Sequence, residues 1–141
     1  MRTLWISDLH LGTPACRAAE LSAFLDRVTA DRIYLTGDIV DLEYLSTRAR
    51  FPRAHWCILK QLIRLAGSRT EITCIPGNHD FELRELAGRS LCGIDIALEA
   101  LHTTADGRRL LVIHGDCLDP RIREDSSIEQ WGATMRRSRQ G

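Results

Sequence analysis

The sequence predicts an α/β fold with a mainly parallel sheet, and two observations support this prediction. Short apolar runs alternate with segments in which apolar residues recur at helical spacing. Four of the apolar runs are followed directly by residues with carboxylate, amide or imidazole side chains. Turns beyond the carboxyl ends of parallel strands are where α/β proteins expose reactive side chains. The 141 residues, 44% of them hydrophobic, suit one domain with a real core.

The first part of the chain reads as a strand–helix–strand unit. Residues 3–6 form a short apolar run that we expect to be a buried central strand. A helix is predicted to start at residues 13–14, and residues 33–35 resume as a second strand. The apolar face of this helix would consist of Ala18, Leu21, Leu25 and Val28. Such a unit favours a right-handed crossover between parallel strands.

The next part contains a second such unit and a hairpin. A second amphipathic helix is predicted over residues 55–67, and residues 71–75 form the third strand. Residues 81–93 are polar and are expected to be helix or loop. Residues 94–104 and 109–113 are predicted to be the two arms of a hairpin, because an Asp-Gly pair lies between apolar arms.

The last stretch, residues 117–141, differs from the rest. It carries several arginines and shows little apolar spacing. We therefore expect a domain over residues 1–116, followed by an atypical tail that is disordered or weakly helical.

Composition narrows the cellular context. The formal net charge is zero, so no global field attracts nucleic acid, and no nucleic-acid partner is expected. The five cysteines are odd in number and form no CxxC pair, which argues against a disulfide framework and a zinc–thiolate site. An apolar run begins almost at the first residue, so we expect no signal peptide. No apolar run approaches the roughly 20 residues that span a bilayer. These features predict a cytoplasmic protein.

The strand ends carry the chemistry. Taken singly, their polar residues are ordinary turn residues, but four strand ends at one edge of one sheet predict a metal site. The residues concerned are Asp8 and His10, Asp38 and Asp41, Asn78, His79 and Asp80, and His114 and Asp116. Oxygen and nitrogen donors without thiolate suit Mn²⁺, Fe²⁺ or Zn²⁺ better than Ca²⁺. Two such cations, roughly 3.5–4 Å apart, would clamp a phosphoryl oxygen and hold a bridging hydroxide that attacks phosphorus. A single magnesium ion is the alternative, but it would leave the histidines without a role.

The order of these motifs resembles that of the calcineurin-like metallophosphoesterases. The resemblance covers roughly residues 3–116, and the joint motif is highly specific. It is carried by Asp8-x-His10, Gly37-Asp38-x-x-Asp41, Gly77-Asn78-His79-Asp80 and His114-Gly115-Asp116. The resemblance implies an α-β-β-α sandwich, here incomplete at the C-terminus. Residues 7–12, 50–55 and 102–109 are similar to the UDP-2,3-diacylglucosamine pyrophosphatase group, which hydrolyses a nucleotide-lipid pyrophosphate in lipid A synthesis using Mn²⁺.

The resemblance also implies roles for individual residues. Asp8, His10 and Asp38 would hold a first divalent cation, with Mn²⁺ the expected ion. Asp38, Asn78 and His114 would hold a second cation. His79 would stabilise or protonate the leaving oxygen, and Asp80 would orient its ring. Asp41 is expected to lie behind the metal ligands, although a solvated or helix-starting acid is an equal alternative.

The expected substrate is a phosphodiester or a pyrophosphate, including a nucleotide-lipid pyrophosphate. Arg53 and His55 are candidate substrate contacts, and a solvated lead-in to a helix is the alternative. The pyrophosphatase group often carries arginine where this chain has His79, which leaves the exact substrate open. A lipid substrate would imply peripheral contact with the inner membrane, yet the sequence contains no amphipathic anchor.

One motif of the family is missing from this chain. The family supplies a later Gly-His-x-His motif, whereas no histidine follows His114. We therefore expect each cation to lack one protein ligand, and an uncovered apolar face to favour self-association. The alternative function is a truncated, catalytically impaired remnant that binds metal weakly or acts only as a binding domain.

Overall fold

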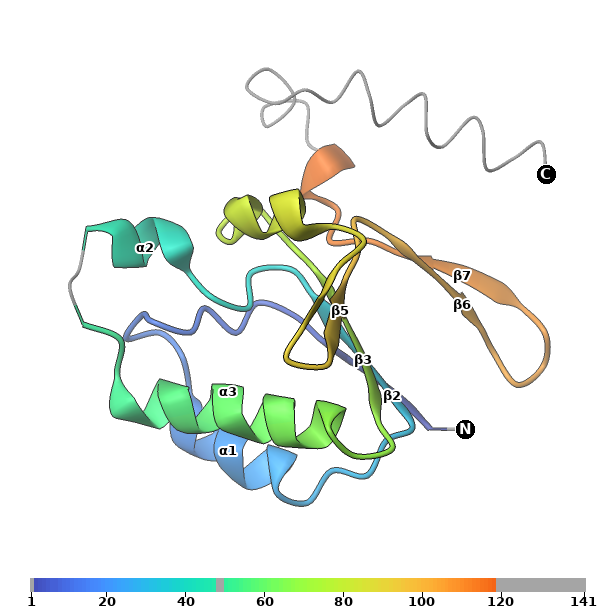
Figure 1. Cartoon of the computed structure of the whole chain (residues 1–141), viewed down its shortest axis with the longest axis horizontal. Helices are drawn as coiled ribbons and strands as arrows, with labels where there is room; N and C mark the ends of the chain where they lie inside the picture. The colour runs from blue at the N-terminus through green and yellow to red at the C-terminus, as the bar shows by residue number, and fades with distance from the viewer. Residues whose placement is uncertain (1, 48–49, 119–141) are drawn as a thin grey trace.

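The computed structural model of the protein describes residues 2–47 and 50–118. Within these ranges the α/β class with a mainly parallel sheet is confirmed (Figure 1). The expected tail lies outside the described residues from position 119 onwards. None of the helices in the described ranges has the length and apolar character needed to cross a bilayer.

The central sheet has five strands in the order β1-β2-β3-β5-β4. Neighbours from β1 to β5 run parallel, and β4 pairs with β5 in the antiparallel direction. The strands are β1 (Thr3–Ile6), β2 (Arg32–Thr36), β3 (Glu71–Ile75), β4 (Ser90–Leu91) and β5 (Ile94–Ile96). Because β1, β2 and β3 are parallel neighbours, the loops that follow them leave the sheet at the same edge.

Helices α1 (Ala18–Leu25) and α3 (Arg53–Ala66) lie side by side on one face of the sheet (Figure 1). The main core forms between these helices and the sheet. Its fully buried side chains include Leu25, Ile33, Leu35, Ile58, Leu62 and Ile72. Truncating one such side chain to alanine typically costs about 2–5 kcal/mol, so this core fixes the position of the loops at the sheet edge.

The other face of the sheet carries a second, two-stranded sheet. It consists of β6 (Ala100–Thr103) and β7 (Arg109–Val112), which pair antiparallel and lie on the far side from the helices (Figure 1). Val112 packs against Tyr34 and Ile75 of the central sheet in a small second core. This packing directs the chain after β7 towards the loops that follow β2 and β3.

The predicted bounds are confirmed for β1 and β3, and helix α1 differs most from its prediction. It begins at Ala18 instead of residues 13–14. The reason lies in Thr13, whose hydroxyl donates to the carbonyl of His10 (3.0 Å) and accepts from the Ala15 N–H (3.3 Å). These bonds hold the segment as a turn and delay the helix.

Two sequence-based expectations need correction. Residues 94–104 were expected to form one hairpin arm, but they divide into β5 of the central sheet and β6 of the second sheet. The Ala97 N–H donates to the Cys74 carbonyl (3.0 Å), which extends the pairing with β3 before the chain crosses over. His114 therefore follows a strand of the second sheet, so the four strand ends do not belong to one sheet. A short helix, α2 (Leu42–Ser46), was not predicted.

Candidate metal centre

The loops after β1 and β2 run side by side. The Asp8 N–H donates to the Gly37 carbonyl (3.1 Å), and the His10 N–H donates to the Asp38 carbonyl (2.9 Å). These two bonds bring Asp38 next to Asp8 and His10, which lie about thirty positions earlier in the chain.

The same three residues have an unusual backbone. Asp8, His10 and Asp38 have φ angles of 56°, 45° and 54°, in the left-handed region. This conformation costs a residue with a Cβ roughly 1–2 kcal/mol. Strain of this kind persists where the surrounding structure enforces it, commonly at functional sites. In this chain the backbone hydrogen bonds between the two loops supply that constraint.

Asp38 lies at the centre of the cluster. Only 4% of the residue is exposed. Its Oδ1 atom accepts a hydrogen bond from the His79 N–H (2.9 Å). Its Oδ2 atom lies 3.9 Å from His10 Nε2 and 3.6 Å from His114 Nε2. One carboxylate oxygen therefore faces two imidazole nitrogens from two different loops.

Both of these histidines have one ring nitrogen occupied. His10 Nδ1 lies 3.0 Å from Asp41 Oδ2, and His114 Nδ1 lies 3.1 Å from the Thr36 carbonyl oxygen. Because each partner only accepts, the proton belongs on Nδ1 and the Nε2 lone pair is left facing Asp38. Metal-binding histidines typically have this arrangement. The donor set therefore fits divalent cations on either side of Asp38 Oδ2.

His79 lies next to His10, and the two rings meet edge to face with centroids 4.9 Å apart. Its Nδ1 atom is buried and makes no hydrogen bond, although Asp41 Oδ2 lies 3.2 Å away. One ligand atom each from His10, Asp38 and His79 can be chosen within 4.8 Å of one another. His79 was predicted as an acid, and its position is also compatible with a metal ligand.

Asp80 departs from its expected role. Its carboxylate is fully buried and accepts hydrogen bonds from the N–H groups of Gly77 (2.6 Å) and Ile39 (2.8 Å). Longer bonds come from the N–H groups of Asp38 and Val40. A buried carboxylate needs such donors, and they draw it into the protein, away from the His79 ring. The expectation that Asp80 orients this ring is therefore corrected, because the carboxylates beside His79 Nδ1 belong to Asp41 (3.2 Å) and Glu43 (3.4 Å).

Asp41 connects the two rings to helix α2. It is 5% exposed, and its Oδ1 atom accepts from the Tyr44 N–H (2.8 Å), which caps the helix. Burial raises the pKa of this carboxyl group, but the hydrogen bonds from Tyr44 and His10 and the nearby His79 ring outweigh burial and lower it overall. Asp41 therefore stays ionised between the two histidines.

The other predicted ligands lie at the rim of the cluster. Asp8 and Asn78 are exposed, and their side chains have no hydrogen-bond partner in the part of the chain that the structure describes. Asp8 is placed by its backbone bond to Gly37, and Asn78 by its position next to His79. Both side chains are therefore accessible from solvent beside the buried Asp38.

The sequence did not predict an ion pair that joins two of the loops. The guanidinium group of Arg84 pairs with Asp116 and also donates to the Pro76 carbonyl (3.3 Å). Pro76 precedes the Asn78 loop, and Asp116 follows His114. Asp116 was singled out as a strand-end acid, but its partner lies 32 positions away and no pattern links the two.

The two candidate substrate residues lie in different environments. Arg53 is exposed at the start of α3, whereas His55 is 5% exposed, and its Nδ1 atom accepts a hydrogen bond from the Gly12 N–H (2.8 Å). The structure does not bring them to one surface, and contact of either residue with substrate stays a prediction.

Comparison with known proteins agrees with these motifs. The sequence profile of the family described as calcineurin-like phosphoesterase matches residues 1–137. Proteins named UDP-2,3-diacylglucosamine hydrolase are also similar. Identity is 28% for that of Shewanella baltica (strain OS155), over 100% of this chain and 62% of the relative. It is 33% for that of Serratia proteamaculans, over 93% of this chain and 53% of the relative. It is 35% for that of Aeromonas salmonicida, over 84% of this chain and 46% of the relative. The chain thus spans about half the length of these relatives.

Proposed function

Because the chain belongs to the calcineurin-like phosphoesterase family, we propose that it is a metal-dependent hydrolase of phosphodiester or pyrophosphate bonds. The observation that carries this proposal is the position of Asp38 Oδ2, which faces the Nε2 atoms of His10 and His114. The names of the similar proteins support a nucleotide-lipid pyrophosphate, of the UDP-2,3-diacylglucosamine kind, as the substrate class.

The proposal assigns two divalent cations to the cluster, with Mn²⁺ as the first choice and Fe²⁺ or Zn²⁺ as alternatives. One would be held by Asp8, His10 and Asp38, and the other by Asp38, Asn78 and His114. When bound, such ions polarise phosphoryl oxygens and lower the pKa of bound water. The chain's own contribution is to keep the Nε2 lone pairs of its histidines and the Oδ2 atom of Asp38 directed at one place.

In this proposal His79 serves the leaving group. Asp41 Oδ2 lies 3.2 Å from Nδ1, where it would pair with a protonated ring, and this leaves Nε2 as the atom available to the leaving oxygen. Asp80 acts at a distance, because its hydrogen bonds to the Gly77 and Ile39 N–H groups fix the loops that carry His79 and Asp38. A lipid-linked substrate would place the protein on the cytoplasmic side of the inner membrane, in peripheral contact with it.

Hydrolysis of bis-p-nitrophenyl phosphate with Mn²⁺ tests the activity. We expect turnover by the wild-type chain and none by Asp38→Ala. Asp38→Asn is the matched variant, because its amide oxygen still accepts from the His79 N–H while the second carboxylate oxygen is lost. Equal background rates for all three chains would contradict the enzyme proposal.

A second candidate function has its own observation. One ligand atom each from His10, Asp38 and His79 can be chosen within 4.8 Å of one another, and such a set can hold an ion without supporting turnover. Measuring bound Mn²⁺ beside activity separates the two functions. Metal bound by the wild type but not by Asp38→Asn, without turnover, would support a metal-binding domain that lacks catalysis.

A further inference from the structure

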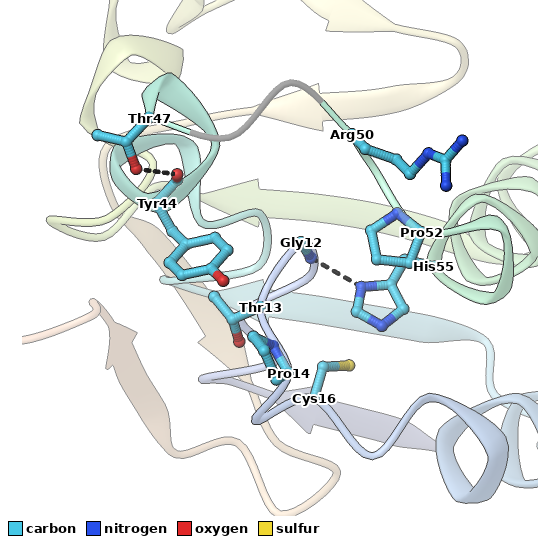
Figure 2. Close-up of a pocket in the computed structure, with 9 residues that line it drawn as sticks. All are labelled: Gly12, Thr13, Pro14, Cys16, Tyr44, Thr47, Arg50, Pro52 and His55. Carbon is cyan, nitrogen blue, oxygen red and sulfur yellow. Dashed lines mark hydrogen bonds between the residues drawn. The ribbon is translucent and has the colours of Figure 1, made fainter.

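A pocket of about 470 Å³ lies between the loop after β1 and residues at the end of α2 and the start of α3 (Figure 2). Pockets of this size are typical of small-molecule sites. Its lining consists of Gly12, Thr13, Pro14, Cys16, Tyr44, Thr47, Arg50, Pro52 and His55. No residue of this lining belongs to the cluster around Asp38.

The pocket nevertheless adjoins that cluster on two sides. Thr13 donates from both its N–H (3.1 Å) and its hydroxyl (3.0 Å) to the carbonyl of His10. Helix α2 carries Tyr44 and is followed by its C-cap Thr47, and its N-cap is Asp41, the carboxylate beside His10 and His79. Gly12 follows His10 by two residues, a backbone span of at most about 7 Å. One ligand could therefore contact the cluster and the pocket at the same time.

His55 is the most constrained polar group of the pocket. Because Nδ1 accepts the Gly12 N–H, the proton of the neutral ring belongs on Nε2. Figure 2 shows the bond to Gly12 and the second ring nitrogen turned away from it, on the side of Cys16. Nε2 has no hydrogen-bond partner among the described residues. Burial also lowers the pKa of His55, which favours the neutral ring. The result is a fixed N–H donor in a residue that is 5% exposed.

The charge of the lining indicates what this donor binds. Arg50 is the only charged residue among the nine that line the pocket, and none of them is acidic. Arg50 has no acidic partner in the part of the chain that the structure describes. The Thr47 hydroxyl already donates to the Tyr44 carbonyl, and the Thr13 hydroxyl to that of His10. The groups of this lining that can donate to a ligand thus include an imidazole N–H and a guanidinium, and with no carboxylate beside them they suit an oxyanion rather than a cation.

We propose that this pocket is a second phosphate subsite, in which His55 Nε2 and Arg50 donate to phosphoryl oxygens of the substrate group that is not attacked. The inference rests on the proposed function for the identity of the substrate and deepens it. It assigns phosphate recognition to His55 and Arg50, and it leaves out Arg53, which does not line the pocket. A pyrophosphate diester would then lie with one phosphorus at the metal cluster and the other in the pocket.

The test measures binding without metal, so that it does not depend on turnover. The chain in excess EDTA is titrated with inorganic phosphate, with uridine 5′-monophosphate and with uridine, while NMR follows the His55 ring nitrogens. We expect both phosphates to shift the Nε2 signal of His55 and uridine to leave it unchanged. Stronger binding of the nucleotide than of phosphate would mean that the pocket also holds the attached nucleoside.

The variants separate recognition from folding. In His55→Asn the side-chain oxygen can still accept from Gly12, but the Nε2 donor is gone. We expect His55→Asn and Arg50→Gln each to weaken phosphate binding about 10- to 100-fold, as the loss of a charge-assisted hydrogen bond would. Arg69→Gln is the matched control and should bind like the wild type, because Arg69 is exposed and does not line the pocket.

Two results would overturn the subsite. One is a His55 ring signal in the wild type that phosphate does not change, a measurement that needs no variant to fold. The other is equal phosphate affinity in the wild type, His55→Asn and Arg50→Gln. If phosphate shifts the His55 signal and both variants bind it more weakly, but no hydrolysis is detected, the result counts against the proposed catalysis and not against the subsite.

Discussion

Gly77→Ala offers a sharp test of the metal centre, because it adds one methyl group beside Asp38. A Cβ on Gly77 would lie 2.2 Å from Asp38 Oδ1, 2.7 Å from the Asp38 backbone nitrogen and 2.9 Å from His114 Cδ2. Ordinary contact begins at 3.4 Å, so Oδ1 would have to move by about 1.2 Å, which is 3.4 minus 2.2. Gly77 is not among the glycines with positive φ, so the effect of alanine comes from this crowding and not from a left-handed backbone.

This displacement is large for a ligand. Metal–ligand distances are typically held to about 0.2 Å, so a shift of roughly six times that value removes the Asp38 carboxylate from its place. Substituting a residue that only hydrogen-bonds a metal ligand typically lowers metal affinity about 10- to 100-fold, and we expect at least this loss of Mn²⁺ affinity in Gly77→Ala. Overpacking should also lower the free energy of unfolding by about 1–3 kcal/mol.

Calorimetric titration with Mn²⁺ and thermal unfolding of the metal-free chain measure the two effects. Gly67→Ala is the control, because its Cβ would lie 3.5 Å and 3.6 Å from its nearest neighbours at the end of α3. It should leave metal affinity and stability near their wild-type values. Wild-type Mn²⁺ affinity in Gly77→Ala would refute the assignment of Asp38 as a ligand.

Three further predictions follow from individual contacts. Asp41→Asn should weaken Mn²⁺ binding about 10- to 100-fold while the chain stays folded, because His10 loses its anionic partner. An unchanged Mn²⁺ affinity in calorimetric titration would contradict this prediction. The pKa of His55 is lowered from 6.5, so its contribution to stability is present above pH 6.5 and is lost as the pH falls through the folded value. In denaturant titrations without metal, the free energy of unfolding should fall by up to about 1.4 kcal/mol per pH unit in that window, and His55→Asn should lack this component. Arg84→Met leaves the Asp116 side chain buried without its cation and should lower the free energy of unfolding by about 3–5 kcal/mol in denaturant titrations. The double variant Arg84→Met/Asp116→Asn should recover much of this loss. Equal stability of the single and the double variant would refute the ion pair.

Local sequence patterns predicted the elements that carry the site. Residues 3–6 and 71–75 are strands because apolar runs of that length, bounded by turn residues, have few alternatives. Helix α3 begins at Arg53, two residues before the predicted start, because Pro52 stands immediately before its first residue. The division of residues 94–104 between two sheets was missed, since an apolar run does not reveal which sheet a strand joins.

The candidate site was predictable in its residue types but not in its partners. The approach of His10 and His114 to Asp38 follows from strand ends that meet, whichever sheet supplies the strand. That Asp80 binds backbone N–H groups instead of lying beside His79 could not be predicted. It depends on which buried N–H groups need an acceptor once the loops are packed. The family resemblance implied Asp80 as the partner of His79, but the folded chain places the Asp41 carboxylate 3.2 Å from the ring instead.

The buried carboxylate of Asp80 has a consequence for the motion of the site. It accepts from Gly77 in the loop after β3 and from Ile39 in the loop after β2. If one loop opens without the other, the Asp80 carboxylate and the N–H groups of the loop after β2 lose each other as partners, and whichever of them stays buried is left unsatisfied at a cost in free energy. The amide hydrogens of Gly77 and Ile39 should therefore exchange with deuterium at one common, slow rate, while the exposed Asn78 amide between them in the site exchanges quickly. Loops coupled in this way would move as one body, so the donor atoms would keep their relative positions before a cation enters the site.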